Sequence, residues 1–306
     1  MFSGIPYGRY LDTEKCRVSV DNVRVKFTYK YKNFNFDKCE PVLAVEQLYN
    51  RIDSLFFHRD GFDICWAACE SFKIGNYVRT ARISGLNWSC AVLLGRYAFD
   101  SSCRNIAPEA VLDFNPNKVP EEWYSNILCL LRDGALSCEI SRYDVAFDFP
   151  MDRGEVTLIP NDRQSYKQFK ESSKGTTEYQ GERSHHAAMK LYDKTKESGL
   201  DVPVTRCEIT VDGSFCGSLK KLFPTLTTYR NLQLDTAFAD LPFEVKACLA
   251  HPDLIPMLQS SVSRNTWSKL KALLTTYGTA ELSPGSWRDI DTFVRSALAA
   301  LKGCAA

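Results

Sequence analysis

The chain has 306 residues, 44% of them hydrophobic and 25% charged, which is enough to bury one large core or two smaller ones. Its formal net charge is only +1, so a surface for nucleic acid has to be a local basic patch rather than a global field. No stretch has the pattern of a signal peptide, and none approaches 18 consecutive apolar residues. We therefore expect a cytoplasmic protein with no membrane contact.

The twelve cysteines are scattered, and most lie in apolar runs such as residues 127–130. Without a secretion signal, this placement predicts reduced thiols that pack as small hydrophobic residues. Cys65 and Cys69 form the closest pair, but no second pair follows at zinc-finger spacing. The pattern therefore argues against a structural zinc site.

In the first half of the chain, residues 1–20 are predicted to be a leader, and an alternating strand is predicted to begin at Asp21. Basic and aromatic residues mix between Lys26 and Phe36, which fits either a phosphate-and-base surface or an ordinary strand with a solvated lysine face. A helix is predicted at 41–53, strands at 73–97 and 111–114, and a further helix that follows Pro120 and is ended by Gly134.

In the second half, residues 139–149 are the clearest strand, and further strands are predicted at 178–194 and 204–212. The polar segment 161–178 is predicted to be an exposed connection. Beyond residue 215 only helices are predicted, at 219–223, 243–250, 267–277 and 287–301. The fold class is therefore α+β, an antiparallel sheet flanked by helices with a small C-terminal helical region. The expected division is a leader of residues 1–20, a main domain of residues 21–245 and a helical region of residues 246–306.

Two of these strands carry charge on one face only. Because successive side chains of a strand point to opposite faces, Arg142 and Asp144 share the face opposite the apolar residues of their strand. Arg206 and Glu208 repeat this arrangement in the later strand. If both strands belong to one sheet, Asp144 and Glu208 converge, and two carboxylates suit Mg²⁺ or Mn²⁺. The alternative is a pair of arginine–carboxylate ladders on a solvated sheet face.

A tyrosine lies between these strands in the sequence. In an extended segment from His186 to Lys194, Tyr192 shares a face with Lys190 and Lys194. Nearby cations favour the phenolate, so Tyr192 is a candidate nucleophile, and a divalent metal beside it would polarise a phosphate. The alternative is a tyrosine with a packed ring and a solvated hydroxyl.

Four segments together resemble the replication initiation factor family of rolling-circle initiators from plasmids and filamentous phages. They are residues 141–148 (SRYDVAFD), 177–184 (TEYQGERS), 190–199 (KLYDKTKESG) and 205–208 (TRCE). Their order and spacing agree with the family across residues 139–212. The tryptophan that the family has before Arg206 is absent, and His185 and His186 are adjacent rather than one residue apart.

The resemblance implies a nicking and joining domain in residues 21–245. It implies that Tyr192 attacks a DNA phosphodiester at an origin, stays linked to the 5′ phosphate and leaves a free 3′ hydroxyl. By the same resemblance, Asp144 and Glu208 hold the metal, and Lys194 supports the phosphate. Arg142, Lys190 and Arg206 are expected to contact DNA that is single-stranded or supercoiled. A host helicase and a polymerase are the implied partners.

Two other function classes compete with this enzyme. A DNA-binding regulator on the same fold would need none of Tyr192, Asp144 and Glu208. An RNA-binding module that uses the aromatic segment near residue 30 would leave the two arginine–carboxylate strands unexplained. The expected activity is therefore metal-dependent cutting and rejoining of one DNA strand.

Overall fold

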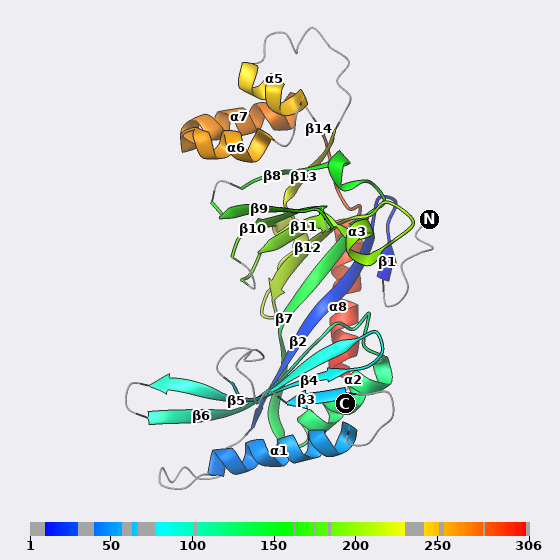
Figure 1. Ribbon diagram of the computed structural model, residues 1–306, viewed down its shortest axis with the longest axis vertical. Helices are drawn as coiled ribbons and strands as arrows, with labels where there is room; N and C mark the ends of the chain where they lie inside the picture. Colours follow the sequence, from blue (N-terminus) through cyan, green and yellow to red (C-terminus); the bar gives the residue numbers. More distant parts are fainter. Residues whose placement is uncertain are drawn as a thin grey trace.

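The computed structural model describes residues 10–29, 40–56, 63–66, 77–100, 103–161, 163–173, 175–182, 185–229, 242–250, 254–277 and 279–303. Within them the fold is α+β, as predicted, and it is built on one large antiparallel sheet (Figure 1). In sheet order the strands are β3 (Asp63–Trp66), β4 (Tyr77–Ser84), β5 (Ser89–Asp100), β6 (Cys103–Phe114), β2 (Arg17–Tyr29), β7 (Ala135–Phe149), β12 (Thr205–Asp212), β11 (Met189–Asp193), β10 (Gly175–Gln180) and β9 (Tyr166–Glu171), with β1 (Tyr10–Asp12) paired to β2.

The two central strands, β2 and β7, connect the two halves of the molecule. They run along its long axis, with β3–β6 at one end and β9–β12 at the other (Figure 1). Their pairing is irregular between Val20 and Val23, where two residues of β2 lie opposite one residue of β7. This bulge lets both valines face the core, and it places Asp21 and Asn22 at the opposite face.

Three amphipathic helices cover the apolar face of the sheet. They are α1 (Glu40–Phe56), α2 (Glu121–Arg132) and α8 (Trp287–Gly303). Helix α1 packs against β5 and β6, α2 against β6 and β7, and α8 against β2 and β7. In α8, Ile290, Val294 and Leu301 recur at helical spacing and are fully or almost fully buried. The main core therefore includes the last helix of the chain.

A second sheet has three strands, β8 (Val156–Ile159), β13 (Thr225–Tyr229) and β14 (Thr279–Glu281), and its Val156, Leu158 and Leu226 are part of the main core. The helices α5 (Phe243–Ala250), α6 (Ile255–Ser261) and α7 (Arg264–Tyr277) form a second, smaller unit. Trp267 of α7 is its largest buried side chain, surrounded by residues such as Ile159 and Val245. The remaining elements are α3 (Lys194–Ser198) and the 3-10 turns η2 (Arg153–Glu155) and η3 (Leu219–Lys221).

Several predicted boundaries differ from this fold. The first long strand begins at Arg17 rather than Asp21, and β1 precedes it, so the expected leader is structured from Tyr10 onward. The predicted exposed connection at 161–178 forms β9 and most of β10, and the predicted strand at 178–194 is split between β10 and β11. Strands β13 and β14 lie beyond residue 215, where only helices were expected. The division at residue 245 remains a prediction, although α8 packs in the main core.

Other sequence predictions have mixed outcomes. The helices predicted at 41–53, after Pro120, and at 243–250, 267–277 and 287–301 are confirmed. Cys16, Cys90, Cys207 and Cys248 are buried thiols, whereas Cys129 of the apolar run is exposed. Cys69 and residues 30–36 lie outside the described residues. No described helix is long and apolar enough to cross a bilayer.

Candidate functional site

The face of the sheet opposite the helices is lined with polar residues from β2, β7, β12, β11 and β10. Cross-strand pairing places Tyr192 of β11 beside Arg206 of β12, and Arg206 beside Asp148 of β7. One step along the strands, Lys190 pairs with Glu208. The predicted convergence of the two charged strands on one face is therefore present, with β11 as their neighbour.

Tyr192 and Glu208 are joined by a hydrogen bond. The Tyr192 hydroxyl donates to Glu208 Oε1 at 2.7 Å, and the tyrosine is only 4% exposed. Burial, followed by the negative charge of Glu208, raises the pKa of Tyr192 well above its ordinary value. The phenol is therefore neutral in this structure. The flanking lysines had instead predicted a pKa below the ordinary value for Tyr192.

The two lysines beside Tyr192 have different environments. Lys190 Nζ lies 3.7 Å from the centroid of the Tyr192 ring, a cation–π contact. Lys194 is not in the strand but is the first residue of α3, where it is 7% exposed and its Nζ lies 2.5 Å from Glu197 Oε2. Lys194 is therefore paired with a carboxylate in this structure, and its role toward phosphate stays a prediction.

Arg206 is the centre of a buried ion-pair cluster. Its guanidinium donates to both oxygens of Asp148, at 2.5 and 2.7 Å, and to Asp21 Oδ2 at 3.2 Å. Asn115 also donates to Asp21, and Arg206 holds the pKa of the Asp21 carboxyl below its ordinary value against the effect of burial. Because Arg206 is 5% exposed and bonded on several sides, it is poorly placed for the DNA contact expected of it.

Asp21 and Asp148 belong to the site but were not predicted from the sequence to be site residues. Asp21 became part of the site through the bulge in β2, because the bulge shifts the alternation of the strand by one residue. The signal was in the sequence: Val18 and Val20 follow one alternation, whereas Val23 continues another. Asp148 lay on the predicted polar face of its strand, but no pattern showed that it would pair with Arg206.

The predicted metal ligands line one hollow of about 240 Å³. Asp144 Oδ1 is buried there without a hydrogen-bond partner, and so is Nε of Arg142, which lines the same hollow. Burial raises the pKa of Asp144, and burial together with Asp21 raises the pKa of Glu208 to about 7. An unsatisfied carboxylate oxygen and a carboxylate with a raised pKa both fit a bound cation.

The carboxylates available to such a cation are few. Among the described residues, no group of three or more His, Cys, Asp or Glu side chains is arranged to hold a metal ion. Asp144 and Glu208 could therefore supply two ligands, with the other positions left to water or to ligand oxygens, as is usual for Mg²⁺. His186, whose ring nitrogen accepts from the backbone N–H of Asp212, lies outside this pair.

A larger hollow of about 810 Å³ adjoins the first and opens beside Tyr192. The two hollows share Tyr179, Gly181 and Lys190. The ring of Phe169, which is 53% exposed, lies 5.8 Å from the ring of Tyr179 at the far side. The reactive tyrosine candidate thus borders an open, aromatic-lined surface although its own hydroxyl is covered.

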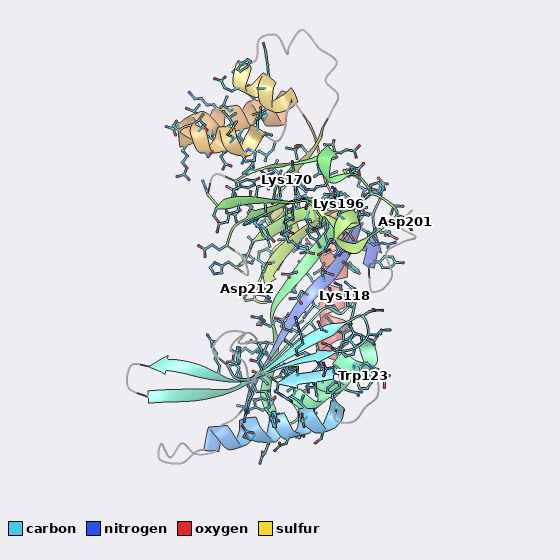
Figure 2. All side chains as sticks on the ribbon, in the orientation of Figure 1. Lys118, Trp123, Lys170, Lys196, Asp201 and Asp212 are labelled. Carbon is cyan, nitrogen blue, oxygen red and sulfur yellow. The ribbon has the colours of Figure 1, made fainter. Side chains whose placement is uncertain are left out.

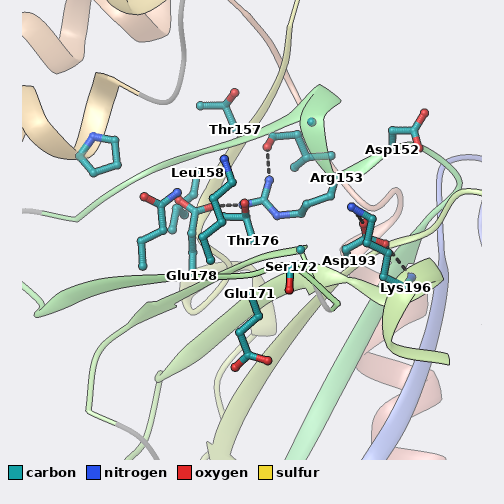
Figure 3. Close-up of a pocket in the computed structure, with 16 residues that line it drawn as sticks. Asp152, Arg153, Thr157, Leu158, Glu171, Ser172, Thr176, Glu178, Asp193 and Lys196 are labelled. Atoms are coloured by element: carbon teal, nitrogen blue, oxygen red, sulfur yellow. Dashed lines mark hydrogen bonds and ion pairs between the residues drawn. The ribbon is translucent and has the colours of Figure 1, made fainter.

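A separate hollow of about 400 Å³ lies on the opposite face of β9 and β10 (Figure 3). The ion pair of Arg153 and Glu178 lines it, and Tyr166 donates to Glu178 at 2.5 Å. At its other end, Lys196 Nζ lies 3.7 Å from Asp193 Oδ2. These charges neutralise one another and hold η2 and α3 against the sheet edge, so we assign this hollow a structural role.

No known protein family and no curated protein matches this sequence. Among the solved structures that do match is a rolling circle replication initiator protein from Geobacillus stearothermophilus, at 14% identity and a TM-score of 0.36. The match covers 88% of this chain and 99% of that chain. A likeness at this level establishes neither a shared fold nor a shared activity.

Proposed function

We propose that the protein cuts and rejoins one strand of DNA with Tyr192 as the nucleophile, as a rolling-circle replication initiator does. The observation that carries the proposal is the 2.7 Å hydrogen bond from the Tyr192 hydroxyl to Glu208, at the border of an open polar hollow. A neutral phenol is a weak nucleophile, and a carboxylate in direct contact can accept its proton as the new bond forms. The four sequence segments that resemble the initiator family supply the choice of DNA as substrate.

In this mechanism the Tyr192 oxygen attacks phosphorus, its proton passes to Glu208 Oε1, and the bond to the 3′ oxygen breaks. The products are a 5′-phosphotyrosyl link and a free 3′ hydroxyl, which gains a proton, and the reverse steps rejoin the ends. Lys190, which already lies over the Tyr192 ring, is placed to balance charge on the phosphate. A polymerase extending the 3′ hydroxyl and a helicase opening the duplex are the partners that this role would require.

Asp144 and Glu208 would hold Mg²⁺ or Mn²⁺ in the hollow that they share. When bound, such an ion supplies electrostatic stabilisation of the phosphate oxygens. The buried, unpartnered Oδ1 of Asp144 supports this assignment. Asp144→Asn should therefore reduce cutting sharply, and EDTA should do the same to the parent protein. Full activity in excess EDTA would remove the metal from the proposal.

The test of the nucleophile is Tyr192→Phe. Phe keeps the packed ring but lacks the attacking oxygen, so the variant should form no covalent adduct with DNA. The assay incubates each protein with supercoiled plasmid carrying the source replicon and looks for DNA-linked protein on a denaturing gel. Tyr179→Phe, which removes a hydroxyl from the same surface, is the matched control and should retain the adduct. An adduct that survives Tyr192→Phe rejects the assignment.

A non-catalytic DNA-binding regulator is the second candidate. The near-complete burial of Tyr192 and the raised pKa of its hydroxyl favour it, because structural tyrosines share both features. The same assay separates the two functions. A parent protein that binds the plasmid but forms no adduct under any divalent-metal condition is a regulator.

A further inference from the structure

A third hollow lies on the same polar face, toward the other end of the sheet. It has a volume of about 850 Å³ and is bordered by the turn between β4 and β5 and by the loop after β6. Leu86 at the tip of the turn is 94% exposed, and the ring of Trp88 folds back across Gly85. Arg82 of β4 and Lys118 of the loop, both exposed, line it as well.

This hollow is continuous with the candidate site. It shares Asn22 with the hollow of Asp144 and Glu208, which in turn shares three residues with the hollow of Tyr192. Lys118 is close enough to lower the pKa of Asp21 in the Arg206 cluster. Figure 2 shows Lys118 near the middle of the molecule, between its two halves. The polar face thus carries one track of three adjoining hollows.

Charge is distributed unevenly along the track. The hollow beside Tyr192 is lined by two lysines and three glutamates, one of which, Glu197, is paired with Lys194, so its lining has no excess of positive charge. Among the described residues, the third hollow is lined by three basic side chains, Arg24, Arg82 and Lys118, and by one acidic side chain, Asp113, which accepts hydrogen bonds from Arg24. The phosphates of a nucleic acid are therefore stabilised more strongly at the third hollow than in the hollow beside Tyr192, where Lys190 faces only the phosphate under attack.

We propose that the third hollow, bordered by Arg82, Lys118 and the exposed tip at Leu86, is the anchoring site for the backbone of a single DNA strand. The DNA strand continues from this hollow along the track to Tyr192. Its bases contact Trp88 and Leu86 at the point where the DNA enters the third hollow. The inference rests on the proposed function for the choice of DNA. It assigns the anchoring contacts to the β4–β5 half of the sheet, and not to the buried Arg206 and Lys194.

The experiment compares two double variants that remove the same charge. Arg82→Ala with Lys118→Ala removes the anchor, and Lys220→Ala with Lys221→Ala removes two exposed lysines from η3, which packs with α8 on the other face. Fluorescence anisotropy measures binding of a labelled 20-nucleotide single strand of mixed sequence between about 50 and 200 mM salt. All four side chains are exposed, and thermal melting checks that both variants fold.

The anchor variant should bind the single strand at least about tenfold more weakly at 50 mM salt. The slope of log affinity against log salt should be smaller in magnitude by about 1.4, because each lost phosphate contact removes about 0.7. The η3 variant should match the parent. Equal loss in both variants, or no loss in the anchor variant, overturns the inference. If the parent forms an adduct at Tyr192 but the anchor variant binds the single strand as tightly as the parent, only the anchoring site is rejected. If the anchor variant binds more weakly but the parent forms no adduct, only the nicking function is rejected.

Discussion

At Tyr192, two opposing effects decide the protonation state of the phenol. Burial and the carboxylate of Glu208 favour the neutral phenol, whereas the positive charge of Arg206 in the neighbouring strand favours the phenolate. The neutral form is favoured, because desolvation penalises a buried anion more than an arginine already paired with other carboxylates can compensate. The sequence showed the lysines on either side but not the depth of the ring, so it predicted the wrong direction for this pKa.

Glu208 provides a prediction that does not depend on catalysis. Its pKa in the folded protein is about 7, above the ordinary 4.5, so the unfolded chain loses this proton at lower pH than the folded chain. Below pH 4.5, Glu208 therefore has no effect on the free energy of unfolding. Between pH 4.5 and about pH 7 it lowers this free energy progressively, and above pH 7 the reduction is constant. Glu208→Gln removes this cost, so relative to the parent it should gain roughly 2–3 kcal/mol in unfolding free energy between pH 4.5 and 8.

Urea unfolding of both proteins in EDTA, at several pH values, measures this difference. Glu197→Gln is the control, because the pKa of Glu197 is lowered by its hydrogen bond to Lys194 and its effect should have the opposite sign. For Glu208, a stability difference that stays constant with pH would show that its pKa is not raised in solution.

At the scale of elements, Arg206 connects three neighbouring strands. It lies in β12 and bonds Asp148 of β7 and Asp21 of the bulge in β2. Arg206→Met should destabilise the protein by about 3–5 kcal/mol, because it leaves two buried carboxylates without their cation. Denaturant unfolding monitored by circular dichroism measures the loss.

A double-mutant cycle tests the cause of that loss. Adding Asp148→Leu to Arg206→Met removes the principal stranded carboxylate, so the double variant should be more stable than the sum of the two single losses predicts. Arg24→Met is the matched control: Arg24 pairs with Asp113 on the same face but is 28% exposed, so its loss should cost much less. Purely additive losses at Arg206 and Asp148 would contradict the buried cluster.

The elements that could be predicted from sequence are those with a buried stripe. Strand β7 and helix α8 have strong alternation or helical periodicity, because one face of each packs into the main core. Strand β9 is at the edge of the sheet and almost all of its residues are exposed, so its sequence has no apolar alternation and resembled a polar connection. The site followed the same rule: the faces of Asp144, Glu208 and Tyr192 were predictable, but partners from distant strands were not.

At the scale of the whole molecule, the residues that the structure describes form two cores of unequal size. The main core contains buried residues of α8, whereas Trp267 and its neighbours form a separate cluster under α5–α7. The last helix therefore returns from the small unit to the main sheet, along β2 and β7 (Figure 1). A stretch of sequence predicted to be one helical region is thus divided between the two cores.

Hydrogen exchange should separate the two cores. Trp267→Ala should cost the small core about 3–5 kcal/mol and reduce protection mainly in residues 243–277, because its contacts lie within that cluster. Ile290→Ala should cost about 2–5 kcal/mol and reduce protection in the main sheet, since Ile290 is fully buried in the main core. Met257→Ala, in α6 but 61% exposed, is the control and should change neither. If Trp267→Ala lowers protection in β2 and β7 as much as in α7, the two cores unfold as a single cooperative unit.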